Sequence, residues 1–226
     1  MITSEFKEQE IMLYSSSGEM NDSPVPYSGA GLWIWDGSRV FTFLQSDTPG
    51  LYKSEPFAAT VSSGYWLLLK AGTHVDTAFA VAAPVSPFKR DTIKRKDNLY
   101  KFIYGGSDLP AITDVYFDWS SDPAYCNVYG SCYAKSTYYT LQTIDVVEEF
   151  APDKQEILFP TGTVIIRKKY SLSPAHQAFI RSLLIETEWR GGLFDTEQGN
   201  VPTNFFGNTK GWFGVCMVIN DTAVVR

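Results

Sequence analysis

The clearest local pattern in the chain is LWIWDGSRVFTF, in which Asp36-Gly37 separates two runs of apolar, β-branched and aromatic residues. An Asp-Gly pair favours the positive φ angles of a tight hairpin turn, so the pattern predicts a β-hairpin over residues 31–44. Successive strand side chains alternate between the two faces of a sheet, which places Trp33 and Trp35 together opposite aliphatic residues. Because both faces of this hairpin are apolar, we expect both to be covered.

Further short runs rich in Tyr, Phe, Val, Ile and Thr follow the hairpin, with Gly, Pro and Ser turn signals between them. Turn signals at this spacing, roughly one in every ten residues, are typical of a β-sandwich. The runs predict strands over residues 51–57, 64–70 and 74–82, and then over residues 99–104, 113–119, 137–147 and 163–170.

One helix is strongly indicated, over about residues 173–190 in SLSPAHQAFIRSLLIETEWRGG. Ser173 can cap it, Pro174 suits the first helical position, and Gly191 or Gly192 can end it. A helix with a single apolar stripe must pack on something, and the flanking strands are the obvious partner. The expected fold class is therefore mainly β, with one docked α-helix.

Two prolines at Pro84-Val85-Ser86-Pro87, followed by the polar stretch KRDTIKRKDN, interrupt the strand pattern because they remove two backbone donors. This break divides the chain into a β-sandwich domain over residues 1–85, a linker over 86–98 and a second β-rich domain over 99–226. The basic residues of the break alternate with acidic ones, so we interpret it as a solvated connection rather than a nucleic-acid patch.

Composition and charge exclude several classes of function. The formal net charge is −6, which argues against broad binding of nucleic-acid backbones, because that binding depends on Lys and Arg. No apolar run approaches the roughly 18–20 residues that span a bilayer, so no transmembrane segment is expected. The first residues, MITSEFKEQEIMLY, contain no continuous apolar core of a secretory signal, which predicts either a cytoplasmic protein or a mature or truncated form.

The sequence offers little support for an enzyme. It has only two histidines and contains no nucleophile elbow, zinc-protease motif, P-loop or dinucleotide fingerprint. Asp114, Asp118 and Asp122 recur in DVYFDWSSD, but strand geometry would hold the first two about 13 Å apart, too far for paired acid–base work. We therefore expect no catalytic residues, no cofactor and no metal site.

Three cysteines, Cys126, Cys132 and Cys216, are too few for a disulfide scaffold and lack the paired spacing of a structural zinc site. Cys126 and Cys132 bracket five residues and can close a small loop. Three unlinked thiols fit the residues equally well, because an odd count also suits a reducing compartment.

Aromatic residues gather in the turn-rich loop over residues 119–136. Side chains that combine an apolar ring with a polar tip are enriched where a surface binds a partner, although many such rings also fill cores. Loops on rigid scaffolds often carry recognition. The candidate ligand-binding residues are accordingly Trp119, Tyr125, Tyr129 and Tyr133.

Two stretches of the chain go beyond generic β patterns. The front runs from Gly29-Ala30 through LWIWDG, FTFLQSDTPGLYKSEPF and GYWLLLKAGTHVDTAFA to PVSPF. The closing stretch, YSLSPAHQAFIRSLL followed by GGLFDTEQGNVPTNFFGNTKGWFGV, contains Leu193-Phe194-Asp195, Val201-Pro202-Thr203-Asn204 and Gly211-Trp212-Phe213. Together they resemble the Bacteroidota outer-membrane lipoproteins of domain of unknown function (DUF) 4249. We assign Phe194, Asp195, Pro202, Asn204 and Gly211 to structure, because such residues satisfy or relax the backbone in turns.

The resemblance implies a transthyretin- or immunoglobulin-like sandwich at the front and a place at the outer membrane of the cell envelope. It also implies a non-enzymatic accessory or ligand-capturing role beside a TonB-dependent transporter, with a carbohydrate or peptide as ligand. In the oxidising envelope it favours a disulfide between Cys126 and Cys132 and leaves Cys216 as a thiol.

The chain departs from the family at its start, where it shows neither a signal peptide nor a lipid-bearing cysteine. We therefore expect that part of the family's first domain is missing. Two other functions remain open: a structural or adhesive surface protein, and a carbohydrate-active enzyme, which needs two carboxylates roughly 5–10 Å apart in one cleft.

Overall fold

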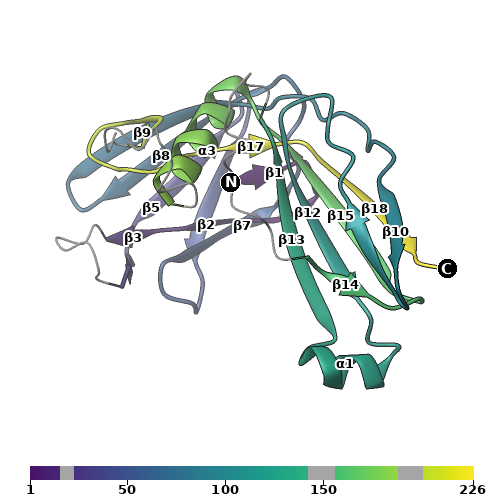
Figure 1. Ribbon diagram of the computed structural model, residues 1–226. Coiled ribbons are helices and arrows are strands. Elements are labelled where there is room, and N and C mark those ends of the chain that lie inside the picture. The colour runs from purple at the N-terminus through teal and green to yellow at the C-terminus, as the bar shows by residue number, and fades with distance from the viewer. Residues whose placement is uncertain (16–22, 142–155, 188–200) are drawn as a thin grey trace. The chain divides into compact units, whose positions relative to one another are not determined.

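The computed structural model describes residues 1–15, 23–141, 156–187 and 201–226. The chain divides into two compact units, the first made of Met1–Pro84 and Gly199–Met217, the second of Val85–Gln198 and Val218–Arg226. Figure 1 labels most of their strands and helices. The fold is mainly β, as the sequence predicts. None of the helices that the structure describes has the length and apolar composition needed to span a bilayer.

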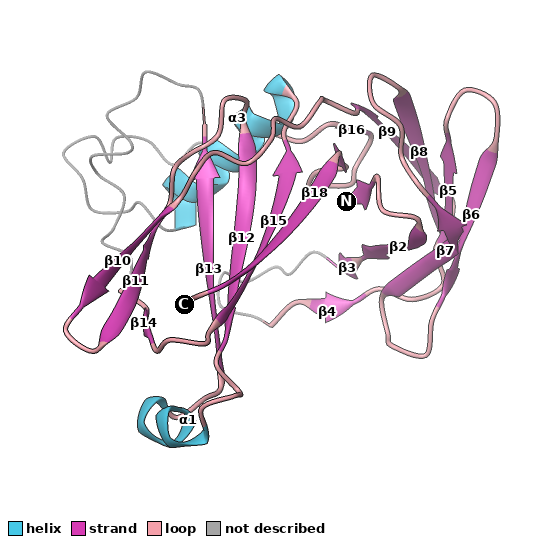
Figure 2. Cartoon of the chain, turned by 90° about the vertical axis from the view of Figure 1, so that its right-hand side faces the viewer, coloured by secondary structure: helices cyan, strands magenta, loops and turns pink. Residues whose placement is uncertain are grey.

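A seven-stranded antiparallel sheet, with the order β16-β9-β8-β5-β6-β7-β2, forms the centre of the first unit (Figure 2). Two further strand pairs, β1 with β17 and β3 with β4, complete the unit. The strands are β1 (Ile2–Thr3), β2 (Lys7–Met12), β3 (Tyr14–Ser15), β4 (Val25–Pro26), β5 (Gly31–Trp35), β6 (Val40–Gln45), β7 (Leu51–Phe57), β8 (Gly64–Ala71), β9 (His74–Val81), β16 (Phe205–Phe206) and β17 (Val215–Cys216).

The predicted hairpin over residues 31–44 is confirmed, with β5 and β6 joined by the Asp-Gly turn. Strand β5 pairs with both β6 and β8, so hydrogen bonds link all seven strands into one continuous sheet. The sandwich expected from the sequence would divide these strands between two sheets. The prediction that the first domain is a transthyretin- or immunoglobulin-like sandwich therefore stays a prediction.

Only one face of this sheet is buried. Leu32, Ile34 and Leu67 lie in the core, where the rings of Phe41 and Phe57 stack 3.9 Å apart. The expectation that both faces of the hairpin would be covered is wrong, because the side chains of alternate residues lie on the opposite face, where no second layer of described residues packs on them. Within the described part of the chain, the sheet thus presents an open face that is rich in apolar side chains.

The segment 201–217 is held on β9 by a buried carboxylate. Asp76 accepts hydrogen bonds from the backbone N–H groups of Asn208 and Thr209, each at 3.0 Å, and from the Thr209 hydroxyl. Gly207, with φ +132°, lies so close that an added Cβ would stand 1.8 Å from Asp76 Oδ1. This approach therefore requires glycine.

The Asn204 side chain forms the second attachment of the same segment. Its Nδ2 donates to the carbonyl oxygens of Phe79 (3.0 Å) and Phe213 (2.8 Å), and its Oδ1 accepts from the Phe213 N–H (2.9 Å). The structural role expected of Asn204 is confirmed. Assignment of residues 99–226 to a single domain is wrong, because these bonds return the segment to the first unit. Leu193-Phe194-Asp195 lies outside the described residues.

The second unit contains a three-stranded sheet, β10-β11-β14, and a four-stranded sheet, β13-β12-β15-β18. One buried cluster includes side chains of both sheets and of the first helix, with Phe117 stacked on Phe159 at 5.1 Å. The elements are β10 (Thr92–Lys96), β11 (Leu99–Ile103), β12 (Ala111–Asp118), α1 (Pro123–Tyr129), β13 (Tyr133–Thr140), β14 (Leu158–Phe159), β15 (Val164–Ser171), α3 (Pro174–Thr187) and β18 (Val218–Val224).

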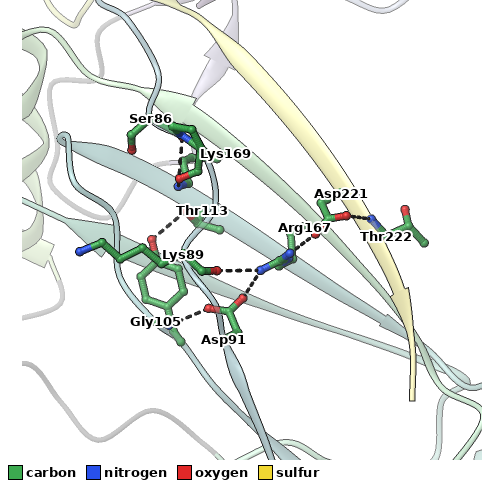
Figure 3. A network of polar contacts seen from close by, with 11 residues as sticks. Ser86, Lys89, Asp91, Gly105, Thr113, Arg167, Lys169, Asp221 and Thr222 are labelled. Carbon is green, nitrogen blue, oxygen red and sulfur yellow. Dashed lines mark hydrogen bonds and ion pairs between the residues drawn. The ribbon is translucent and has the colours of Figure 1, made fainter. Parts of the chain in front are cut away.

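Residues 86–98, expected to form a linker, instead belong to this unit. Strand β10 pairs with β11, and the fully buried Lys169 ammonium of β15 donates to the carbonyl oxygens of Ser86 (3.3 Å) and Pro87 (2.9 Å) (Figure 3). Burial lowers the pKa of Lys169 below its usual value, and the nearby Arg167 guanidinium acts in the same direction.

Arg167, two residues before Lys169 on β15, binds the following residues of the 86–98 segment. Its guanidinium contacts Asp91 at 2.5 Å and also Asp221 of β18, and it lies 4.4 Å from the ring centre of Phe88. Asp91 in turn accepts from the Gly105 N–H at 2.7 Å. These contacts explain why residues 86–98, which have the polar composition of a linker, are ordered within the second unit.

The predicted helix is confirmed as α3, which begins at Pro174. Ser173 Oγ accepts from the His176 N–H at 3.3 Å, as a capping residue does. The predicted end of this helix, and the part of the 137–147 strand from residue 142 onward, lie outside the described residues.

We expect Asp76→Asn to lower the free energy of unfolding by about 1–3 kcal/mol at pH 7, because a neutral amide replaces a carboxylate that accepts two backbone N–H groups. Hydrogen bonds, led by that of Thr209, hold the pKa of Asp76 below its usual value. A depressed folded-state pKa contributes stability that is present above the unfolded value of about 4 and is lost as the pH falls through the folded value.

Urea unfolding at pH 7, 4 and 2.5, followed by tryptophan fluorescence, measures this effect. The difference between the wild type and Asp76→Asn should shrink with acidification, while Asp47→Asn, in an exposed turn, should match the wild type throughout. A difference that stays constant with pH would contradict a role for the ionised carboxylate.

Candidate functional site

The aromatic candidates surround a short helix that the sequence analysis did not predict. Helix α1 begins after Asp122, whose side chain accepts from the Tyr125 N–H at 3.0 Å, and Pro123 occupies its first turn. Gly130, in the left-handed conformation at φ 82°, ends it. The Asp-Pro start and the glycine stop are ordinary helix signals. They could have identified α1 inside the segment that was interpreted as a loop.

A disulfide between Cys126 of α1 and Cys132 holds the helix against the start of β13, with the two Cα atoms 4.5 Å apart. Cys216 lies outside this bond, on β17 of the first unit. It is fully buried, and burial raises the pKa of its thiol to about 12. A thiol of this kind is protonated and shielded from reagents at neutral pH.

Trp119 and Tyr125 form the base of the loop. Trp119 is fully buried, and its indole N–H donates to the Ser131 carbonyl oxygen at 2.8 Å. Tyr125 packs edge-on against Trp119, at 5.5 Å between ring centres, and donates its hydroxyl proton to the Leu158 carbonyl oxygen at 2.6 Å. Burial raises the pKa of Tyr125, which keeps this donor protonated. The expectation that Trp119 contacts a ligand is wrong, because no part of it reaches the surface.

Tyr129 and Tyr133 lie at the surface of the same loop. Tyr129 packs on Trp119 at 4.8 Å and is 39% exposed, while Tyr133, at the start of β13, is 60% exposed. Val128, which directly precedes Tyr129 on α1, is 83% exposed and was not among the residues predicted from the sequence. We call Val128, Tyr129 and Tyr133 the loop surface. It offers apolar contact area with two phenolic hydroxyl groups.

The three carboxylates near the loop all have structural partners. Asp114 accepts from the Thr137 hydroxyl at 2.7 Å and pairs with the Lys135 ammonium at 2.9 Å. Asp118 accepts from a neighbouring backbone N–H, and Asp122 caps α1. In the parts of the chain that the structure describes, no three His, Cys, Asp or Glu side chains lie close enough to hold a metal ion.

A cavity of about 240 Å³ lies elsewhere in the second unit, and it was not anticipated from the sequence. Ligand pockets usually measure about 300–1,000 Å³, so its volume suits only a small group. An ion pair between Lys101 and Glu156, at 3.0 Å, lies on its wall, and burial raises the pKa of Tyr138, another wall residue. Its lining consists of Lys101, Phe102, Ile103, Phe117, Ser136, Tyr138, Glu156 and Ile157.

Comparisons with known proteins do not assign the chain to a family. No protein-family model matches the chain, and no curated protein matches it either. The structure itself defines a mainly β protein of two units, one of which carries a disulfide-closed loop with two exposed tyrosines. Any function must be argued from these surfaces.

Thiol titration tests the cysteine arrangement. In the native protein, isolated without reductant, we expect no rapidly reacting thiol, because Cys216 is buried. Denaturation alone should expose one thiol and denaturation with reductant should expose three, whereas Cys216→Ala should give none and two. Three thiols in the denatured, unreduced protein would contradict the disulfide.

Proposed function

We propose that the protein is a non-enzymatic binding module of the cell envelope, which captures a ligand or a partner through the loop surface of Val128, Tyr129 and Tyr133. One observation carries the proposal: two tyrosine rings are exposed on a segment that a disulfide and a buried tryptophan hold in place. Tyrosine is among the residues most enriched in the energetically dominant positions of interfaces.

The way the loop is held in place favours ligand binding, because its residues would lose little conformational entropy when the ligand binds. Tyr129 rests on Trp119, and the disulfide fixes the helix that carries it. Tyr133 follows Cys132 directly and pairs in register with Asp118 of β12. The Tyr129 ring and the backbone of Tyr133 are thus held before binding, and groups that are already ordered lose little conformational freedom on contact, which favours affinity.

The resemblance to the Bacteroidota outer-membrane lipoproteins supports a more specific role. It suggests an accessory or ligand-capturing component that is associated with a TonB-dependent transporter, with a carbohydrate or a peptide as the captured molecule. A disulfide is expected in an oxidising compartment such as the cell envelope, so the Cys126–Cys132 bond is consistent with this location.

Affinity capture from detergent-solubilised Bacteroidota envelope, with the bound proteins identified by mass spectrometry, tests the proposal. We expect the wild-type chain to recover a TonB-dependent receptor. The double variant Tyr129→Ala/Tyr133→Ala should recover it roughly tenfold less, because truncating two central aromatic contacts typically costs at least that factor.

Tyr14→Ala is the matched control, since Tyr14 is an exposed tyrosine of the first unit, far from the loop in sequence. Circular dichroism should show the same fold for all three proteins, because Tyr14 and Tyr133 are exposed, Tyr129 is partly exposed, and the disulfide still holds α1. Failure to recover any receptor, or equal recovery by the double variant and the control, would contradict the proposal.

A further inference from the structure

The open face of the seven-stranded sheet carries two rows of uncharged, mostly apolar residues that run across neighbouring strands of the first unit. Strand pairing sets the residues of each row directly opposite one another. The first row is Val40, Trp35, Trp66 and Phe79, and the second row is Thr42, Trp33, Leu68, Thr77 and Phe206. We call these nine residues the sheet platform.

Two glycines leave room for two aromatic rings of the platform, those of Trp33 and Phe79. A Cβ added at Gly31 would stand 2.3 Å from the Trp33 indole, and one added at Gly64 would stand 2.7 Å from the Phe79 ring. The tip of each ring therefore occupies the space that a side chain at the glycine would fill. Trp66 packs beside Phe79, at 4.8 Å between ring centres.

The platform is exposed even though it is apolar. Trp35 is 46% exposed, Trp66 42% and Phe206 67%. Exposed aromatic side chains that are contiguous across several strands mark a binding surface more often than isolated ones do. Phe206 joins the platform because Asn204 and Asp76 fix the returning segment on β9, so the surface forms only in the complete fold.

Charge on this face restricts the chemistry of its occupant. All nine platform residues are described, and none of them is ionisable. The threonines add hydroxyl groups, and Lys70, which is opposite Gly31 and Val75, lies one row further along the strands. Other ionisable residues of the same face lie outside the platform: Lys53 is opposite Leu44 and pairs with Glu8 and Glu10. The platform itself, with aromatic rings, hydroxyl groups and no charge, suits a neutral ligand that has flat apolar faces and hydroxyl edges.

We propose that the sheet platform binds a neutral oligosaccharide chain by stacking its pyranose rings on the indole and phenyl faces. The C–H bonds on the face of a pyranose are weakly positive and pack on the negative face of an aromatic ring. The hydroxyl groups at the ring edge stay in water or bond to Thr42 and Thr77. This site lies in the other structural unit from the loop surface and stands independently of the receptor proposal.

Isothermal titration of the full chain with neutral hexasaccharides of glucose, mannose, xylose and N-acetylglucosamine, together with pull-down on insoluble cellulose and chitin, tests the site. We expect at least one of these probes to bind. Trp35→Ala/Trp66→Ala should weaken the binding tenfold or more, since removing stacked rings has effects of that size on other flat ligands. Trp35→Phe/Trp66→Phe should restore part of the loss.

Two controls separate the site from a general effect on folding or charge. Leu44→Ala, on the same open face but outside the platform, should bind as the wild type does, and so should Tyr129→Ala/Tyr133→Ala in the other unit. Binding should be unchanged between about 0.05 and 0.5 M salt, because screening acts on charges and the platform has none.

Three results would overturn the proposal. One is the absence of binding to every probe. Another is binding that the alanine variant retains in full. The third is a concentration-dependent dimer of the wild type that Trp35→Ala/Trp66→Ala abolishes, which would assign the platform to contact between two copies of the chain.

Discussion

The carboxylate of Asp76 is the point on which the first unit depends. It lies on β9, in the first half of the chain, and binds the backbone of Asn208 and Thr209 in the C-terminal region. A buried carboxylate must be satisfied by donors, and here the donors come from a segment of the C-terminal region that Asn204 also attaches to β9. Because this segment includes β16 and β17, the edge of the seven-stranded sheet and the pairing of β1 both depend on its attachment by Asp76 and Asn204.

Side chains alternate along the strands, so the sheet has one face that packs in the core and one that is open. The side chains of Leu32 and Ile34 fill the core, and those of Trp33 and Trp35 between them fall on the open face. In a strand such as β5, every residue is apolar, but only alternate side chains can reach the packed side of the sheet. The aromatic side chains between them therefore stay exposed. The apolar composition that is typical of a strand buried on both faces here produces an exposed apolar surface on the open face.

Local patterns in the sequence predicted much of the fold, and long-range contacts account for most of what they missed. The Asp-Gly turn identified the hairpin, and residues 51–57 were predicted with the bounds that β7 has. Strand β10 was missed because all five of its side chains are exposed, so it has no hydrophobic period, and it exists through pairing with β11. The return of segment 201–217 depends on Asp76, more than a hundred positions earlier, which no local signal can show.

The binding candidates illustrate the same division between local and tertiary information. Val115, Phe117 and Trp119 alternate along one buried face, so strand parity alone argues that Trp119 belongs to the core. Exposure of Tyr133 depends instead on where the disulfide and α1 place the start of β13. In the loop surface and in the sheet platform alike, the exposed rings are positioned by groups beneath or beside them, a buried indole in one case and two glycines in the other. Recognition at either surface would therefore depend on residues that never touch the ligand, because they fix ring orientation before contact and so reduce the entropy lost on binding.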